Sequence, residues 1–287
     1  MQKAFRETKI RGSIQFPYKI YTSLIPEHFS SFPMHWHDDF EIIWVKSGHL
    51  WINIQSKLYL CGPEDILIIP PKYIHSIKQY KKESAHYCNM IFKFSLLEQD
   101  TDSWIYKKYF SQFINEPLFE SVYFPGGSEN QKKLKPFTNI LYEARHSFDS
   151  SEMKIKAALY NFLDEVKNLL VPETENFKTT KREISRLKPV FSFVEENFSE
   201  NLTVDHMAET ACLSRSHFMT VFKKVTGQTF VNYVNTIRLE NAKRMILETD
   251  KSILEISEDC GFNNFSYFIR TFKKQYGKTP LSIRKNQ

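Results

Sequence analysis

The chain contains few cysteines and no long apolar segment. Its four cysteines, Cys61, Cys88, Cys212 and Cys260, lie far apart and form no C-x-x-C pair. This spacing argues against a disulfide framework and a structural zinc site, and it is typical of reduced thiols in a cytoplasmic protein. No apolar run approaches the roughly 20 residues that span a bilayer. The first residues lack the apolar stretch of a signal peptide, so we expect a cytoplasmic protein that has no membrane partner.

Charge is nearly balanced over most of the chain, and the small positive excess is concentrated at one end. The net charge is +6. Residues 181–287 contain 17 Lys and Arg against 12 Asp and Glu, whereas residues 1–180 contain 22 against 21. A surface that binds phosphate groups requires such an excess, so the composition favours a C-terminal region that contacts nucleic acid.

An internal repeat occupies this basic region. The segment Ser216–Thr229 recurs as Ser266–Thr279, with serine, both phenylalanines, the Lys-Lys pair, glycine and threonine in the same places. Each copy, with the residues just before it, predicts a short helix, a tight turn and a longer helix. This is the helix-turn-helix motif, whose second helix enters the major groove of DNA. Two such motifs in tandem predict a protein that binds double-stranded DNA and reads its sequence.

Polar residues mark where the helices of the repeat begin. Thr203 and Ser214 are expected to be N-caps in the first motif, because their side chains can accept hydrogen bonds from free backbone N–H groups. In the second motif, Ser252 followed by Glu255 predicts a capping box. A further helix is expected from about Pro189 to Phe198, because proline is tolerated in the first turn of a helix.

The two predicted turns differ at one position. Gly261 lies where the turn requires a left-handed backbone, which glycine adopts without strain. The equivalent residue of the first motif is Cys212. A left-handed backbone at Cys212 is expected to cost on the order of 1 kcal/mol.

Helical spacing divides each longer helix of the repeat into an inward and an outward face. Phe218, Val221, Phe222 and Val225 are expected to face the core in the first motif, and Phe268, Thr271 and Phe272 in the second. The opposite faces form the candidate DNA-binding surface. Its members are Arg215, Ser216, His217, Met219, Thr220 and Lys223 in the first motif, and Phe265, Ser266, Ile269, Arg270 and Lys273 in the second.

Among these residues, Arg270 is the strongest candidate for reading a base, because its planar guanidinium matches the O6 and N7 acceptors of guanine. Later lysines such as Lys273 are expected to meet phosphates. Met219, Phe265 and Ile269 have two interpretations. They contact thymine methyl groups, or they pack within the helical region.

A continuous helix is expected between the motifs, from about Phe230 to Leu247. At 1.5 Å per residue it spans roughly 27 Å. The two recognition helices can then occupy adjacent major grooves, which are roughly 34 Å apart. One polypeptide can therefore hold two half-sites.

The first part of the chain has a different pattern. Up to about residue 98, short apolar runs alternate with turn residues, which predicts an antiparallel sandwich or barrel. The runs are Phe40–Val45, Leu50–Ile54, Ile66–Ile69 and His86–Phe94. Apolar residues from Ile155 to Leu170 recur with helical spacing, Asn139–His146 is a candidate partner helix, and the polar segment 172–180 predicts a linker.

We therefore expect an α+β multidomain fold. An N-terminal antiparallel β-barrel occupies residues 1–98, and a helical connector with its linker occupies residues 99–180. An all-α domain with two helix-turn-helix motifs occupies residues 181–287.

The segment Leu202–Arg284 resembles the DNA-binding domain of the AraC/XylS family of bacterial transcription regulators. The matching segments are Arg238–Ala242, Ile253–Phe262, Ser266–Lys274 and Gly277–Pro280, together with Arg284. One departure is Ser257, where the family usually has alanine. The resemblance implies base-reading or adjacent positions for Ser216, Met219, Thr220, Ser266 and Arg270.

A second motif, His35-Trp-His37 followed by Glu41, lies in the N-terminal region. On an extended strand these three residues project to one face. Two imidazoles and a carboxylate form a suitable ligand set for a divalent metal ion, and His75 is expected to supply the fourth ligand.

The segment His35–Glu41 and a second segment, which runs from Asp65 through His75, resemble the two cupin motifs. The sensor domains of the AraC family are cupin-like. The first motif matches fully. In the second, Lys72 replaces the usual glycine and Gln79 the usual asparagine.

The same residues allow another interpretation, in which they bind an organic effector instead of a metal. Imidazole and carboxylate groups can bind the hydroxyls of a small polar molecule such as a sugar, and a tryptophan can stack on its ring. For each of Trp36, Trp44 and Trp51 taken singly, an ordinary place in the barrel core is the favoured interpretation. The candidate effector-binding residues are His35, His37, Glu41, Trp44 and His75.

These observations predict a transcription regulator that is not an enzyme and requires no cofactor apart from a candidate divalent metal. We expect a homodimeric activator that binds promoter DNA, a small-molecule effector and RNA polymerase. Two alternatives stay open. One is a metal-dependent cupin sensor or enzyme fused to a DNA-binding domain, and the other is a regulator without a small effector.

Overall fold

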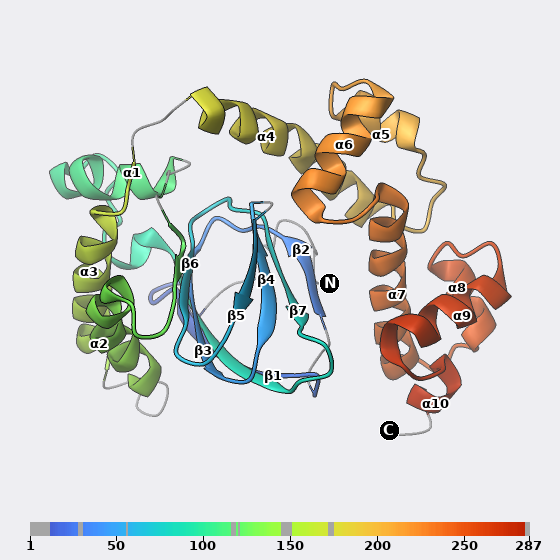
Figure 1. The fold of residues 1–287 in the computed structure, drawn as a ribbon, viewed down its shortest axis with the longest axis horizontal. Helices are drawn as coiled ribbons and strands as arrows, with labels where there is room; N and C mark the ends of the chain where they lie inside the picture. Colours follow the sequence, from blue (N-terminus) through green and yellow to red (C-terminus); the bar gives the residue numbers. More distant parts are fainter. Residues whose placement is uncertain are drawn as a thin grey trace. The chain divides into compact units, whose positions relative to one another are not determined.

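The computed structural model describes residues 12–27, 31–55, 57–115, 119, 121–144, 151–171 and 175–284 (Figure 1). The chain divides into two compact units between Phe177 and Lys178. We call them the N-terminal unit and the C-terminal unit. None of the helices in the described ranges has both the length and the apolar character needed to cross a membrane.

The N-terminal unit is built on two antiparallel sheets. One has five strands in the order β1-β8-β3-β6-β9, and the other has four in the order β2-β7-β4-β5. The strands are β1 (Tyr18–Ile25), β2 (Ser31–His35), β3 (Phe40–Ser47), β4 (Leu50–Ile54), β5 (Lys57–Cys61), β6 (Ile66–Ile69), β7 (His75–Gln79), β8 (Ala85–Phe92) and β9 (Tyr123–Phe124). The antiparallel β fold is thereby confirmed, but the described strands pair into two sheets and not into one continuous ring.

Strand β3 is buried on both faces, from Phe40 to Val45. Side chains alternate along a strand, so Glu41 and Ile43 lie on one face and Ile42 and Trp44 on the other. The first face is turned toward the four-stranded sheet, where Glu41 contacts His75 of β7. The second face is covered by helices.

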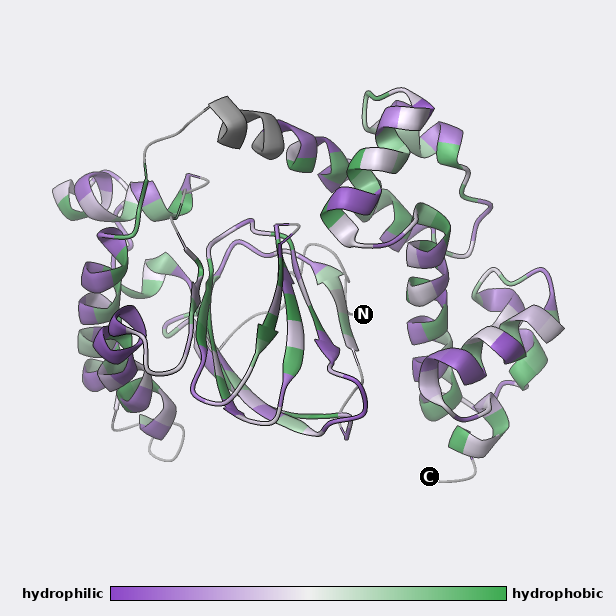
Figure 2. Ribbon diagram, in the orientation of Figure 1, coloured by the Kyte–Doolittle hydropathy of each residue, from purple (hydrophilic) through white to green (hydrophobic). Residues whose placement is uncertain are grey.

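The covering helices are α2 (Glu129–Glu143) and α3 (Glu152–Lys167), which pack against each other beside the five-stranded sheet (Figure 1). Along both helices hydrophobic and hydrophilic residues alternate (Figure 2). The apolar residues of α3 predicted to share a face, from Ile155 to Val166, are buried as expected. Along the chain, β8 is followed by a 3-10 helix (Phe94–Leu96), a π-helical turn (Tyr106–Phe110) and α1 (Ser111–Ile114), and then by β9.

Two details of this region differ from the sequence-based expectation. The helix predicted at Asn139–His146 begins ten residues earlier, at Glu129, where Ser128 caps its N-terminus. His146 lies outside the described residues. The helices also do not form a separate connector, because Leu134, Leu141 and Ile155 belong to the same hydrophobic core as the strands.

The C-terminal unit contains only helices in its described part. They are α4 (Glu175–Glu196), α5 (Val204–Thr210), α6 (Arg215–Thr226), α7 (Phe230–Glu248), α8 (Ile253–Asp259), α9 (Phe265–Tyr276) and α10 (Pro280–Arg284). The pairs α5–α6 and α8–α9 are the two helix-turn-helix motifs, and α7 joins them. The predicted start near Pro189 is wrong. Helix α4 begins at Glu175, inside the expected linker, and Pro189 lies in its interior.

The predicted helix starts of both motifs are confirmed. The side chains of Thr203 and Ser214 accept hydrogen bonds from backbone N–H groups of the first turns of α5 and α6. Ser252 and Glu255 form both hydrogen bonds of a capping box at α8. These caps satisfy backbone donors that would otherwise have no partner within the helix.

The turns also adopt the expected backbone. Gly261 has φ +80° and Cys212 has φ +53°, so both residues are left-handed. Only glycine fits the second turn, because a Cβ at position 261 would lie 2.5 Å from the carbonyl oxygen of Ser199. Cys212 therefore carries a side chain in a conformation that disfavours one.

Replacing Cys212 by glycine should raise the free energy of unfolding of the C-terminal unit by about 1 kcal/mol, because the steric cost of the left-handed backbone disappears. Scanning calorimetry of the full chain measures the effect. Gly261→Ala is the matched control and should lower stability. Equal or lower stability of Cys212→Gly would show that Cys212 is not strained.

Candidate nucleic-acid interface and effector site

The apolar residues predicted to face inward on the two recognition helices are buried, whereas Thr271, predicted to lie with them, is half-buried. Phe218, Phe222, Phe268 and Phe272 are fully buried. In the first motif, the rings of Phe222 and Tyr233 lie 5.4 Å apart, which joins α6 to α7. Each recognition helix is thus held by its apolar face, and the opposite face is exposed.

The exposed face of α6 is lined by small polar, apolar and basic side chains. Ser216, Met219, Thr220 and Lys223 are exposed and border one open surface hollow. Lys224, which sequence reasoning did not include, borders the same hollow. Its Nζ lies 3.0 Å from Glu183 Oε2 of α4.

Two further candidates on α6 have acidic neighbours within the C-terminal unit. Arg215 forms an ion pair with Asp205 of α5. His217 Nε2 lies 3.8 Å from Glu183 Oε1. Arg215 and Lys224 are therefore partly neutralised by the protein itself, whereas the described contacts give Lys223 no such partner.

On α9, Phe265, Ser266, Arg270 and Lys273 are exposed. Ile269 is half-buried and packs against the core formed by α7, α8 and α9. The structure therefore favours the packing interpretation for Ile269. Met219 and Phe265 are each at least 40% exposed, which leaves them available to a ligand.

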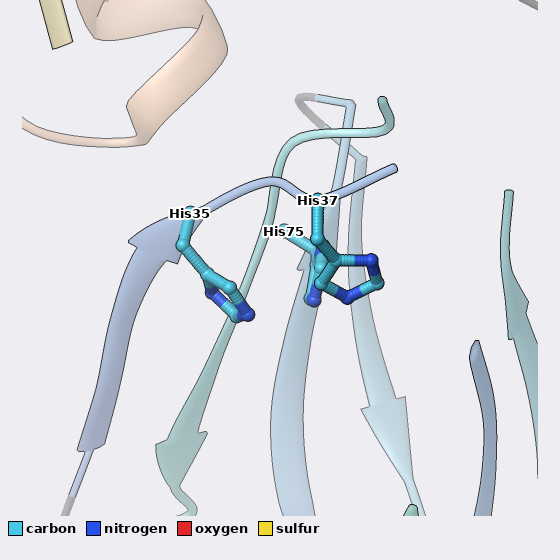
Figure 3. Close-up of side chains that lie close together, drawn as sticks. All are labelled: His35, His37 and His75. Carbon is cyan, nitrogen blue, oxygen red and sulfur yellow. The ribbon is translucent and has the colours of Figure 1, made fainter. Parts of the chain in front are cut away.

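In the N-terminal unit, the four candidate ligand residues come together. His35 at the end of β2, His37 just after it and His75 at the start of β7 converge, as Figure 3 shows. One ring nitrogen of each histidine lies within 4.8 Å of one ring nitrogen of the other two, and all three side chains are buried. Glu41 Oε2 lies 2.9 Å from His37 Nε2 and 3.2 Å from His75 Nε2.

Backbone carbonyls determine which ring nitrogens of this cluster carry hydrogen. His37 Nδ1 is 2.9 Å from the carbonyl oxygen of Asp39, and His75 Nδ1 is 2.9 Å from that of Tyr73. A carbonyl only accepts hydrogen bonds, so each Nδ1 donates and each Nε2 is left facing Glu41. Metal-bound histidines show this same arrangement, with the second nitrogen donating to a carbonyl.

Glu41 is ionised in these surroundings. Burial raises the pKa of its carboxyl group, but the hydrogen bonds and charges of His37 and His75 outweigh burial and bring the pKa well below its ordinary value. The Asn89 amide of β8 also donates to Glu41. Sequence reasoning missed Asn89, because it comes from a strand 48 residues away and belongs to no local motif.

Trp44 is not part of this cluster, contrary to its selection as an effector-binding residue. It lies on the other face of β3, where its ring is 5.6 Å from Tyr142 of α2. The ammonium group of Lys46 lies 3.2 Å from the centre of the same ring. Trp44 thus joins the five-stranded sheet to its helical layer, as a core residue does.

Comparisons with known proteins agree with this architecture. A model for a helix-turn-helix domain matches residues 207–286, and a model for an AraC-like ligand binding domain matches residues 24–163. Together they cover more than half of the chain.

The chain belongs to the AraC family. It is therefore a DNA-binding transcription regulator that carries a ligand-binding domain.

Individual relatives of this AraC-family regulator are distant. An uncharacterized HTH-type transcriptional regulator of Bacillus subtilis, YdeC, is 22% identical over 98% of this chain and 96% of its own length. The HTH-type transcriptional activator RhaS of Mannheimia succiniciproducens is 25% identical over 88% of this chain and 89% of its own. The melibiose operon regulatory protein of Escherichia coli is 32% identical, but over 41% of this chain and 40% of its own length.

Replacing Lys223 or Lys273 by alanine should weaken binding to all DNA duplexes and reduce the slope of log K against log salt by about 1, because one phosphate contact is lost. Fluorescence anisotropy at several salt concentrations measures the slope. Lys133→Ala, an exposed lysine of α2 in the N-terminal unit, is the control and should leave the slope unchanged. An unchanged slope in Lys223→Ala or Lys273→Ala would remove that lysine from the phosphate contacts.

Proposed function

We propose that the protein activates transcription in response to a small polar effector. Recognition helices α6 and α9 bind promoter DNA, and the cluster around Glu41 binds the effector. The observation that carries this proposal is the pair of recognition helices, each anchored by buried phenylalanines with its basic face exposed.

A sugar or related metabolite is the proposed effector. His35, His37, His75 and Asn89 can donate hydrogen bonds to hydroxyl oxygens, and Glu41 can accept them. The name of one relative, the melibiose operon regulatory protein, supports the same class. The effector must bind one arrangement of the protein more tightly than another, because a ligand with equal affinity for both shifts nothing.

The proposal also covers the activator role, the assembly of the protein and its site of action. The activator role follows the named activity of the relative RhaS. A homodimer formed through α2 and α3 is supported by the exposed Ile140, Met153 and Tyr160 on these helices. An activator also contacts RNA polymerase, and both meet promoter DNA in the cytoplasm.

Replacing Arg270 by alanine should weaken specific binding by about 1–3 kcal/mol and relax sequence choice at one base pair. The duplex is obtained by selection from a random-sequence library with the full-length protein. Arg270→Lys is the matched variant. It keeps the positive charge but loses the planar fork, so it should lose discrimination while it retains affinity for unrelated DNA. Unchanged discrimination in both variants would exclude Arg270 from base reading.

A second candidate function for the cluster is divalent-metal binding. Metal binding would require the Nε2 atoms of His37 and His75 to release the hydrogens that bond Glu41. Their lone pairs and the carboxylate oxygen, 2.9 and 3.2 Å away, would then face one cation. Ligand atoms that share a metal at about 2.1 Å lie roughly 3–4 Å apart, close to the spacing within this cluster. Three imidazoles and a carboxylate suit a transition-metal ion. Such an ion would supply a charged anchor for an effector oxygen.

The relatives named above are transcription regulators, which favours a metal-assisted sensor over an enzyme.

Elemental analysis of the purified, tag-free protein tests the metal. About one divalent ion per chain is expected, because the cluster forms a single site. The ion should be lost in His37→Ala and kept in His49→Ala, whose histidine is exposed and paired with Glu83. Wild-type protein that holds no metal would contradict metal binding and leave the organic effector, to be sought by thermal-shift screening of sugars.

A further inference from the structure

Tyr267 of α9 connects the linking helix α7 to the second recognition helix. Its hydroxyl oxygen accepts a hydrogen bond of 3.0 Å from the side-chain amide of Asn235 on α7. Asn235 is 9% exposed, so its amide group depends on protein partners. The Tyr267 ring also lies 6.4 Å from the ring of the buried Phe262. The ring of Tyr267 is therefore held at its hydroxyl by Asn235 and flanked by an aromatic neighbour.

Arg270 lies against this ring. Its guanidinium carbon is 5.6 Å from the centre of the Tyr267 ring, one helical turn further along α9. At this distance a guanidinium is attracted to the face of an aromatic ring. Because Tyr267 is fixed from α7, the attraction reduces the number of side-chain conformations that an exposed arginine samples.

Restricting Arg270 before it meets DNA has an energetic consequence. A flexible arginine loses side-chain entropy when it forms a bidentate contact, and a side chain that is already ordered loses less. We propose that Asn235 and Tyr267 are positioning residues that hold Arg270 in the conformation that reads DNA. The proposal rests on the base-reading role proposed above for Arg270.

The first motif has no equivalent arrangement. The position of Tyr267 is occupied there by His217, which lies near Glu183 of α4, and the position of Arg270 is occupied by Thr220. Only in the second motif does the linking helix α7 therefore contact a residue that positions the base-reading side chain. A change at Tyr267 should consequently affect one half of the DNA site and not the other.

The test uses the full-length protein and the duplex selected from a random library. Binding of wild type, Tyr267→Phe, Arg270→Ala and the double variant is measured on this duplex and on duplexes in which each base pair is changed in turn. Tyr267→Phe keeps the ring and loses the hydrogen bond from Asn235. Tyr276→Phe is the matched control, because it makes the same change further along α9. Thermal unfolding compares the melting temperatures of the two phenylalanine variants, which shows whether either substitution destabilises the fold more than the other.

In Tyr267→Phe, we expect the ratio of affinities for the selected and the changed base pair at the position read by Arg270 to fall about two- to tenfold. This is the range for loss of one hydrogen bond. Affinity for unrelated DNA and the salt slope should stay as in wild type. In the Arg270→Ala background, Tyr267→Phe should have no further effect on discrimination. Tyr276→Phe should discriminate as wild type does.

Three outcomes would overturn the inference. In the first, Arg270→Ala loses discrimination but Tyr267→Phe retains it or weakens all duplexes equally, and then only the positioning role fails. In the second, Tyr267→Phe still reduces discrimination in the Arg270→Ala background, which means that Tyr267 contacts DNA directly. In the third, Arg270→Ala keeps full discrimination at every base pair, and the base-reading role of Arg270 fails first.

Discussion

The geometry of DNA recognition in this protein depends on one helix being shared between two cores. The N-terminal half of α7 places Phe230 and Tyr233 against the aromatic residues of α6. Its C-terminal half places Leu239, Ala242 and Ile246 in the core that contains Phe268 and Phe272 of α9. An α-helix is stiff and has a fixed rise per residue. Both recognition helices pack against α7, so the length of α7 between their contacts fixes the distance between them. Their separation is therefore set by packing within the C-terminal unit.

Local patterns predicted much of the C-terminal unit. The spacing of Phe218, Phe222, Phe268 and Phe272 identified the buried faces, since helical period alone assigns residues to a side. Capping residues identified the helix starts because a capping hydrogen bond is also local: it joins residues only three positions apart. The exception is α4, where Pro189 is a weak local signal that the surrounding helix overrides.

Contacts between distant segments were harder to predict. The single extended strand expected to carry His35, His37 and Glu41 does not form, because His35 ends β2 in one sheet and Glu41 lies in β3 of the other. Parity along β3 does place Glu41 and Trp44 on opposite faces. Asn89 could not be found this way, because its contact with Glu41 depends on how β8 pairs with β3. The merging of α2 and α3 with the β-sheet core is likewise a tertiary effect. An amphipathic helix shows that it has an apolar face but not what that face covers.

The ionised Glu41 occupies a position that belongs to both sheets. It projects from the five-stranded sheet, whereas His35 and His75 belong to strands of the four-stranded sheet. A buried carboxylate is costly to desolvate unless it is paired. Separating the two sheets would remove the histidine partners of Glu41, so this charge holds the sheets together in addition to apolar packing. Any molecule that occupies the cluster therefore contacts both sheets at once.

The exposed turn at Cys212 also makes the native chain chemically addressable. The other three cysteines are buried, and burial raises the pKa of the Cys260 thiol to about 12 and that of the Cys61 thiol further still. Thiol reagents attack the thiolate at accessible positions, so they should modify Cys212 selectively. A fluorophore attached there sits two residues before the N-cap of the first recognition helix. The wild-type sequence thus contains its own site for a spectroscopic reporter of DNA engagement.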